Sequence, residues 1–430
     1  MALAGADQQK AELRPVSFKN VLRWWYRAGR GHIDREEEAR LFGDTRQASP
    51  FRLHLKPLNE HAKKSTPYDV FLKTNKFDVS IWGKLSGLGY LGYSLNPFGE
   101  GREPRSVIEP GARFELKLTF PAWFSETEKQ ALWASLWLLV WFGGLGTRSR
   151  RGFGGLRVID ADSAGKLSLS YLAPAAADLR GFLEENLHTV RTWLDGVTSP
   201  SPLPMPDYTA IVPGWTRIFV HDTPRSGWEE ALDVTGKDMR EFRERKPPED
   251  YEEIRDFLLS GVEPETVKRA AFGLPLTFFY RSVEKRKLAE LLIDELNRRS
   301  RPNAHQHAQH IANLNRKQDR VDAMLQLGFR AGDAKDLLTR ARKRATAQIK
   351  PQHHDRRASP LLVRICRIER GQYARLYVLL KSRLLQQDEQ LLISCEGRSG
   401  AAAITPPDFD RIDFFFDEQP YNAQFLEVTL

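Results

Sequence analysis

The residues with the clearest chemical potential form one glycine-rich and arginine-rich segment, Gly143-Gly-Leu-Gly-Thr-Arg-Ser-Arg-Arg-Gly-Phe-Gly-Gly155. Its glycines permit backbone conformations with positive φ and let a ligand approach the main chain closely. Arg148, Arg150 and Arg151 offer forked guanidinium donors that match phosphate oxygens. The segment lies between an expected apolar helix and an expected strand. We therefore interpret it as an exposed loop suited to a nucleic-acid backbone, with a plain glycine-rich turn as the alternative.

Neither a nucleotide cofactor nor a metal ion is expected from the motifs of this chain. The loop lacks the Gly-Lys-Ser/Thr of a P-loop, and it follows a helix, whereas a Rossmann fingerprint opens one. Cys366 and Cys395 are the only cysteines, so the sequence has no CxxC pair, no four-cysteine zinc site and no disulfide framework. This cysteine usage, together with an N-terminal segment unlike a signal peptide, favours a cytoplasmic location.

A second basic feature is expected on a helix from Ser17, its predicted N-cap, to about Ala28. On a helical wheel its basic side chains fall within about a quarter turn and form the basic stripe Lys19, Arg23, Arg27 and Arg30. Val21, Trp25 and Ala28 lie on the opposite side. The apolar side is expected to dock on a sheet, while the basic stripe faces outward, toward either phosphates or water.

The rest of the first 160 residues alternates between helices and strands. Asp34 with Glu37, and Ser125 with Glu128, have the spacing of capping boxes and predict helices that end near 42 and 142. Alternating apolar residues predict strands at 51–56 and 113–120, and a further strand is expected at 156–160. This order lacks only a leading strand to complete a βαββαβ unit, since residues 1–16 show no alternating apolar run. The first strand of that unit is therefore expected to be missing.

The second half is expected to hold strands at 215–220, 270–279, 361–368 and 373–380, and helices at 228–245, 284–299 and 310–345. Closely spaced prolines near 207 predict a linker. The resulting domains are 1–165, a helix and proline-rich linker at 166–207, and 208–430.

Charge is concentrated in one segment. The 430-residue chain has a formal net charge of +9, and residues 281–357 alone hold 19 Lys or Arg against 9 Asp or Glu. Such a balance commonly accompanies a polyanionic partner, although a solvated helical surface is equally expected. The most apolar run, residues 131–142, is shorter than the roughly 20 residues that a membrane span needs. We interpret it as a buried helix.

Four stretches resemble a known family. The pattern Gly144-x-Gly146, five residues, Gly152-x-Gly154 after a hydrophobic helix resembles the glycine-rich loop of the RAMP superfamily of CRISPR RNA-binding proteins. The stretches 14–27 (Arg-Pro-Val-Ser-Phe-Lys-Asn-Val-Leu-Arg-Trp-Trp-Tyr-Arg), 271–276 (Ala-Phe-Gly-Leu-Pro-Leu) and 357–362 (Arg-Ala-Ser-Pro-Leu-Leu) are similar to the first subunits of Cmr (type III-B) effector complexes.

The resemblance implies an α+β fold with two ferredoxin-like (RRM-like) halves, the second carrying the basic helical insertion 281–357. It implies no catalytic residue, and it implies guide CRISPR RNA, target RNA and other Cmr subunits as partners, with no membrane. The residues expected at the RNA are Arg14, Lys19, Arg23, Arg27, Arg30, Gly144, Gly146, Thr147, Arg148, Arg150, Arg151, Gly152 and Gly154.

Histidines leave one enzymatic alternative open. His307 and His310 would share a helix face near His305, and His353-His354 follow, but solvated surface histidines are the favoured interpretation. His32 could act as a general base, which would make the chain a metal-independent CRISPR RNA-processing endonuclease. A basic scaffold that contacts only proteins is a further alternative. Aromatic stacking on the strand 113–120 is not supported, since its outward positions are Arg, Glu, Lys and Thr.

Overall fold

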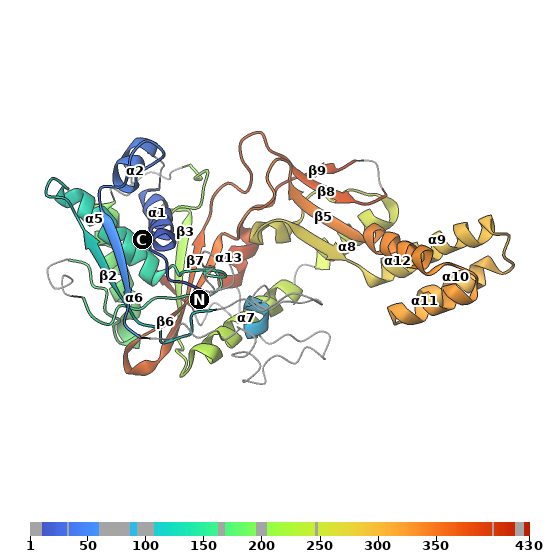
Figure 1. Cartoon of the computed structure of the whole chain (residues 1–430), viewed down its shortest axis with the longest axis horizontal. Helices are drawn as coiled ribbons and strands as arrows, with labels where there is room; N and C mark the ends of the chain where they lie inside the picture. Colours follow the sequence, from blue (N-terminus) through green and yellow to red (C-terminus); the bar gives the residue numbers. More distant parts are fainter. Residues whose placement is uncertain are drawn as a thin grey trace. The chain divides into compact units, whose positions relative to one another are not determined.

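The computed structural model describes residues 11–31, 34–59, 87–92, 107–161, 168–194, 204–245, 248–397, 400–417 and 425–430 (Figure 1). The chain forms two compact units. The first unit comprises Met1–Phe242, Pro360–Arg383 and Asp413–Leu430, and the second comprises Arg243–Ser359 and Leu384–Ile412. These units do not divide near residue 207, because helices from the first 194 residues share one hydrophobic core with strands that lie between residues 216 and 428.

The first unit begins with two helices joined by a short connection. Helix α1 spans Pro15–Arg30, and its N-cap is Arg14 with no side-chain capping bond, so the predicted Ser17 cap is wrong. Proline suits the first helical position because its missing N–H would have no partner there. Helix α2 spans Arg35–Phe42, and the Asp34 carboxylate accepts the N–H groups of Glu36 and Glu37, which confirms the cap predicted there.

Two antiparallel strands and a buried helix follow. β1 (Arg52–Pro57) pairs with β2 (Phe114–Thr119), and their apolar side chains pack on the core as the alternation predicts. Helix α5 (Glu126–Trp141) begins with the predicted capping box of Ser125 and Glu128. α1 packs mainly on α5 rather than on a sheet, although Phe18 also contacts Phe114 of β2. Within the described ranges, no helix combines the length and apolar character needed to cross a membrane.

A four-stranded antiparallel sheet completes the first unit. Its strands are β3 (Thr216–His221), β6 (Leu361–Arg367), β7 (Tyr373–Leu380) and β10 (Phe425–Val428), in the order β10-β3-β7-β6. Helix α7 (Trp228–Arg245) follows β3, and helix α13 (Asp410–Asp417) precedes β10. The path is therefore strand, helix, strand, strand, helix, strand. Of these elements, β3, α7, β6 and β7 lie where the sequence predicts them.

Both faces of this sheet are covered. On one face Phe219 stacks on Phe416 of α13, with ring centroids 4.1 Å apart, and Tyr377 packs beside them. On the other face the side chains of Ile218 and Val378 join the core of α1, α5 and α6 (Leu179–Trp193). The unit also contains α4 (Gly87–Leu91) and the 3-10 turns η3 (Ala176–Asp178) and η5 (Glu369–Gly371).

The predicted strand at 156–160 is not formed. One guanidinium nitrogen of Arg364 on β6 donates a hydrogen bond to the carbonyl of Leu156, which would otherwise be free to pair with a strand. Residues 156–160 are therefore irregular backbone, and the preceding loop is joined to β6 through a parallel bridge between Arg151 and Val363.

The second unit contains a separate antiparallel sheet. Its strands β4 (Leu276–Phe279), β5 (Thr346–Pro351), β8 (Leu391–Cys395) and β9 (Ala402–Ile404) are neighbours in chain order. Helix α8 (Pro248–Ser260) covers one face with Ile254, Phe257 and Leu258, near the 3-10 turn η4 (Lys268–Phe272). Helix α8 and strands β5, β8 and β9 do not follow from the sequence pattern, because these short segments carry weak periodicity.

Four helices connect β4 to β5. They are α9 (Arg281–Arg298), α10 (Ala304–Asn313), α11 (Lys317–Gln326) and α12 (Ala331–Arg344), and they share a core that includes Leu292, Ile311, Met324 and Leu338. Helix α9 confirms the helix predicted at 284–299, whereas the helix predicted at 310–345 is divided among α10, α11 and α12. The last part of the predicted helical segment 281–357 contains strand β5 instead of helix.

Candidate nucleic-acid interface

The basic stripe of α1 faces the acidic side of α2. The Arg23 and Arg27 guanidinium groups both donate hydrogen bonds to the Glu38 carboxylate, and Arg30 Nη2 donates to Glu37 Oε2 at 2.6 Å. The Glu38 side chain is only 2% exposed. Three cations that the sequence assigns to RNA are therefore already in ion pairs within the fold, and the sequence analysis missed their partners.

Burial and hydrogen bonding act in opposite directions on this cluster. Burial is the largest single effect and raises the pKa of Glu38, but the hydrogen bonds and positive charges of Arg27 and Arg23 together hold that pKa below its ordinary value. Burial lowers the pKa of Lys19, with a further contribution from Arg23, and Lys19 Nζ lies 4.9 Å from the ring centroid of Phe51. Arg14 is exposed at the start of α1. On this side of α1, Arg14 and Lys19 are thus the cations that do not pair with Glu37 or Glu38.

The glycine-rich loop closes on itself. The Leu145 N–H donates to the Gly154 carbonyl at 2.9 Å, and the Arg151 N–H donates to the Arg148 carbonyl at 2.8 Å. φ is positive at Gly146, Arg148, Gly152 and Gly154. A Cβ on Gly154 would lie 1.9 Å from the Leu145 carbonyl oxygen. The loop's own closure therefore demands glycine at 154, a reason for its type that is independent of any ligand.

The loop is held between α1 and β6. The Arg150 guanidinium lies 5.1 Å from the ring centroid of Trp24 on α1, and the Val363 N–H donates to the Arg150 carbonyl at 3.0 Å. Burial lowers the pKa of Arg148, and Tyr90 opposes that effect. Residues 146–151, Thr147 among them, are all partly exposed. The structure thus brings the arginine loop next to α1, the helix that carries the basic stripe.

Arg364 lies behind the loop and was missed by the sequence analysis. Its Nη2 donates to the Val140 carbonyl at 2.9 Å and to the Leu156 carbonyl, and burial lowers its pKa. A Cβ on Gly155 would lie 1.4 Å from its Nη1 atom. In the part of the chain that the structure describes, no carboxylate pairs with Arg364. A single arginine within the apolar run of β6 is the signal that could have identified it.

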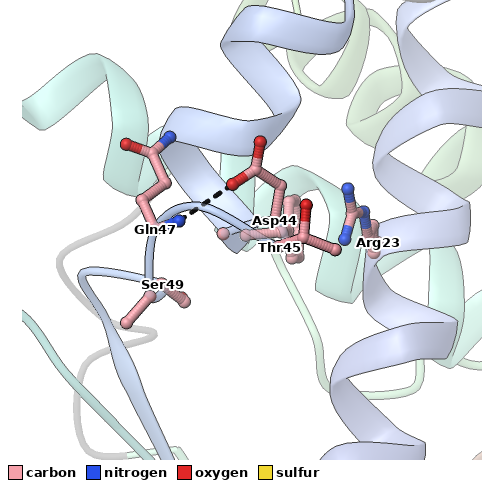
Figure 2. A pocket seen from close by; sticks show the side chains of 8 residues that line it. Arg23, Asp44, Thr45, Gln47 and Ser49 are labelled. Atoms are coloured by element: carbon pink, nitrogen blue, oxygen red, sulfur yellow. Dashed lines mark hydrogen bonds between the residues drawn. The ribbon is translucent and has the colours of Figure 1, made fainter.

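A shallow pocket of about 470 Å³ lies beside the basic stripe (Figure 2). The turn after α2 lines it opposite Arg23, and the Asp44 carboxylate accepts the N–H groups of Arg46 and Gln47 at 2.8 and 2.9 Å. These two bonds lower the pKa of Asp44. The pocket is lined by Arg23, Phe42, Gly43, Asp44, Thr45, Gln47, Ala48 and Ser49. Of these residues, the sequence analysis had singled out only Arg23.

Two of the family-like stretches meet in the second unit. Leu274 and Arg357 exchange backbone hydrogen bonds of 2.8 and 3.1 Å, although more than eighty residues separate them in the sequence. A Cβ on Gly273 would lie 2.9 Å from the Arg357 carbonyl oxygen. Burial lowers the pKa of Arg357. The stretches 271–276 and 357–362 therefore act together in holding the start of β4.

The basic segment of the second unit is partly neutralised. Arg320 is buried against Glu284, and Arg299 Nε lies 2.8 Å from Glu295 Oε1. Exposed cations remain on α11 and α12 and just before them, namely Arg316, Lys317, Arg330 and Lys335. This surface is the second basic region that could meet a polyanion.

The histidines do not gather into a site in the described residues. His305 and His310 are exposed on α10, and His354 Nδ1 lies 3.0 Å from Glu389 Oε1. Across the described ranges, no group of three or more His, Cys, Asp or Glu side chains could hold a metal ion. His32 lies outside the described residues.

Known proteins are similar to this chain in part of the sequence and in the fold. Residues 3–157 match the family model of the RAMP superfamily. A Pyrococcus furiosus protein, CRISPR system Cmr subunit Cmr1-1, is 33% identical over 159 residues, which cover 35% of this chain and 42% of that protein. Cmr1-2 of the same organism is 29% identical over 173 residues, covering 36% of this chain and 88% of that protein. The match therefore spans less than half of the first relative.

The fold is shared over nearly the whole chain. The crystal structure of Cmr1 from Pyrococcus furiosus (apo form) matches with a TM-score of 0.51 and 18% sequence identity, covering 97% of this chain and 91% of that one. At this identity the match shows the mixed helix and strand fold alone.

Proposed function

We propose, on the premise that residues 3–157 are a region of the RAMP superfamily, that this chain is a noncatalytic RNA-binding subunit of a type III-B CRISPR effector complex. In this role it holds the sugar-phosphate backbone of guide RNA and target RNA in antiviral defence. Base pairing between the two RNAs then reads the sequence. Its partners are other Cmr subunits, and its place of action is the cytoplasm.

The observation that carries the proposal is the arginine loop. Thr147, Arg148, Arg150 and Arg151 are partly exposed on a loop whose backbone is fixed by its own hydrogen bonds and by β6. Phosphate oxygens prefer forked guanidinium donors, and a pre-organised loop loses little conformational entropy when it binds them. Such contacts hold a nucleic-acid backbone without reading its bases.

The stripe on α1 contributes in two ways. Arg14 and Lys19 supply direct phosphate contacts, because neither has a carboxylate partner in the described residues. Arg23, Arg27 and Arg30 hold α2 in place and add positive potential beside the path of the RNA. This division of roles refines the expectation that all five side chains contact RNA directly.

The fold proposed for this role has two ferredoxin-like halves. The path β3, α7, β6, β7, α13, β10 with strand order β10-β3-β7-β6 supports the C-terminal half, since this is the split βαβ arrangement. The second unit is then an insertion that enters this half at two connections. In the N-terminal half, β1, β2, α1 and α5 support a related arrangement.

A salt series tests the proposal. Fluorescence anisotropy of labelled single-stranded RNA is measured for the wild type and for a variant with Arg148, Arg150 and Arg151 all changed to Ala. We expect weaker binding and a salt slope reduced by about 2, because each lost phosphate contact on a single strand removes roughly 0.7 from it. A matched control changes Arg316, Arg330 and Lys335 of the second unit to Ala.

Each outcome has a consequence. Equal binding by the loop variant, with loss in the control, would transfer the interface to the second unit. No RNA binding by the wild type would favour the protein scaffold. The same samples on a denaturing gel should show intact RNA. RNA cut in the presence of a chelator would replace the proposal with the endonuclease.

A further inference from the structure

We propose that the pocket beside Arg23 binds one unstacked nucleobase that carries an exocyclic amino group. The inference rests on the proposed function, because the base belongs to the RNA strand that the basic stripe holds. The pocket adds to that function a preference for certain bases at one position of the strand.

The pocket is built from the end of α2 and the turn that follows it. Phe42 and Gly43 at the end of α2 line it, and Phe42 is an apolar residue that is otherwise buried. A Cβ on Gly43 would lie 2.6 Å from the Ser49 nitrogen, so the turn folds tightly back on itself. The volume of about 470 Å³ and the open mouth suit a flat ring that enters from solvent.

Asp44 gives the pocket its chemical preference. Oδ1 accepts both the Arg46 N–H and the Gln47 N–H. Among the described residues nothing donates to Oδ2, and the turn therefore leaves one carboxylate oxygen for a ligand. The lowered pKa keeps this group ionised near neutral pH, and an ionised carboxylate accepts hydrogen bonds but donates none.

This preference separates the four bases. The amino groups of cytosine, adenine and guanine can donate to a carboxylate, as the recognition of cytosine by Asp and Glu illustrates. Uracil offers only an N–H that lies between two carbonyl oxygens, which the carboxylate repels. Thr45 and Gln47 are exposed at the same turn and can contact other edges of the base. Protein readout of single-stranded RNA commonly uses such splayed bases.

The position of the pocket links it to the backbone contacts. Arg23 belongs to the basic stripe and also lines the pocket, opposite the turn that carries Asp44, Thr45 and Gln47 (Figure 2). A strand whose phosphates contact Lys19, in the positive potential of Arg23, therefore passes the mouth of the pocket. A base can leave the stack there while its phosphates stay on the stripe.

Asp44→Asn separates recognition from folding. The amide keeps an oxygen to accept the Arg46 and Gln47 N–H groups, so the turn is retained. Its other atom becomes an NH₂ donor, which favours the carbonyl oxygen of uracil over an amino group. Asp178→Asn is the matched control, because it removes the same charge from an exposed position at the start of α6.

The test compares oligo(C), oligo(A) and oligo(U) of equal length by anisotropy at fixed salt. We expect the wild type and Asp178→Asn to bind oligo(C) and oligo(A) about tenfold more tightly than oligo(U), the lower end of the ratio expected of one hydrogen bond to a charged group. In Asp44→Asn the ratio should fall to one or invert, with an unchanged salt slope.

Other outcomes overturn the inference. Equal binding of the three RNAs by the wild type, or an unchanged ratio in Asp44→Asn, contradicts the pocket assignment and leaves the proposed function standing. Absence of RNA binding by the wild type overturns both. Circular dichroism shows whether Asp44→Asn keeps the fold. If Asp44→Asn does not fold, Gln47→Ala replaces it, because this change leaves the backbone bonds of the turn in place, and it should also lower the ratio.

Discussion

The Glu38 carboxylate lies buried beneath Arg27, whose Nη2 donates to Glu38 Oε1 at 2.5 Å while the same carboxylate also serves Arg23. One acidic residue of α2 thus organises two cations of α1. Part of the basic stripe therefore stabilises the packing of α1 on α2, although its side chains alone resemble a ligand-binding surface.

Glu38→Gln should destabilise the first unit by about 2 kcal/mol, because a neutral amide cannot replace charge-assisted bonds to two guanidinium groups. The folded pKa of Glu38 lies below its unfolded value, so the carboxylate stabilises the fold above the unfolded pKa of about 4.3. This contribution is lost as pH falls through the folded pKa. Thermal unfolding at pH 7 and at pH 3 measures both effects.

The pH dependence of the melting temperature tests whether the charge of Glu38 is responsible. The difference in melting temperature between wild type and Glu38→Gln should be large at pH 7 and should shrink at pH 3. Glu36→Gln, an exposed residue in the first turn of the same helix, is the control. A Glu38→Gln variant as stable as this control at pH 7 would show that the buried carboxylate does not organise the two helices.

Gly154→Ala should disrupt the glycine-rich loop. Its φ of +71° and the 1.9 Å approach of a Cβ to the Leu145 carbonyl force the backbone to move, at a cost of about 2 kcal/mol. RNA binding should weaken together with stability. Gly181→Ala on α6 is the control, since nothing lies within 4 Å of its Cβ position and alanine favours a helix. A Gly154→Ala variant with normal stability and affinity would refute the closure argument.

Arg364→Lys should loosen the segment behind the loop. A lysine amine keeps the charge, but its shorter side chain lacks the planar guanidinium whose Nη2 atom reaches both the Val140 and the Leu156 carbonyls. We expect a loss of about 2 kcal/mol and faster hydrogen exchange in residues 143–158. Arg367→Lys, exposed on the same strand, should change neither quantity. Equal exchange rates in the two variants would contradict the role of Arg364.

Arg320→Met should destabilise the packing of α10 and α11 in the second unit. Arg320 Nε donates to the Leu314 carbonyl at 2.8 Å and Nη2 to the Ala312 carbonyl at 3.2 Å, which satisfies the end of α10, and Nη1 faces Glu284. Methionine leaves these groups buried without partners, at a cost of about 3 kcal/mol. Hydrogen exchange in α10 and α11 reports the change, and exposed Arg316→Met is the control. Unchanged protection would argue against this anchor.

Local features followed directly from the sequence. The cap at Asp34, the capping box of Ser125 and Glu128, and the alternation in β1 and β2 depend on residues within a few positions of one another. Their hydrogen bonds and faces are set by helix and strand geometry, which the sequence pattern encodes. The glycine-rich loop was recognised for the same reason, because its spacing is a local property of the chain.

Only the tertiary structure determines which side chains and carbonyl groups find hydrogen-bond or ion-pair partners inside the fold. The pairing of Arg23 with Glu38, the bond from Arg364 that keeps Leu156 out of a strand, and the meeting of Leu274 with Arg357 each join elements that are separate in sequence. A helical wheel treats α1 by itself and leaves its arginines to solvent. Partners from other elements compete for the same donors and carbonyls, and that competition is settled only when the chain folds.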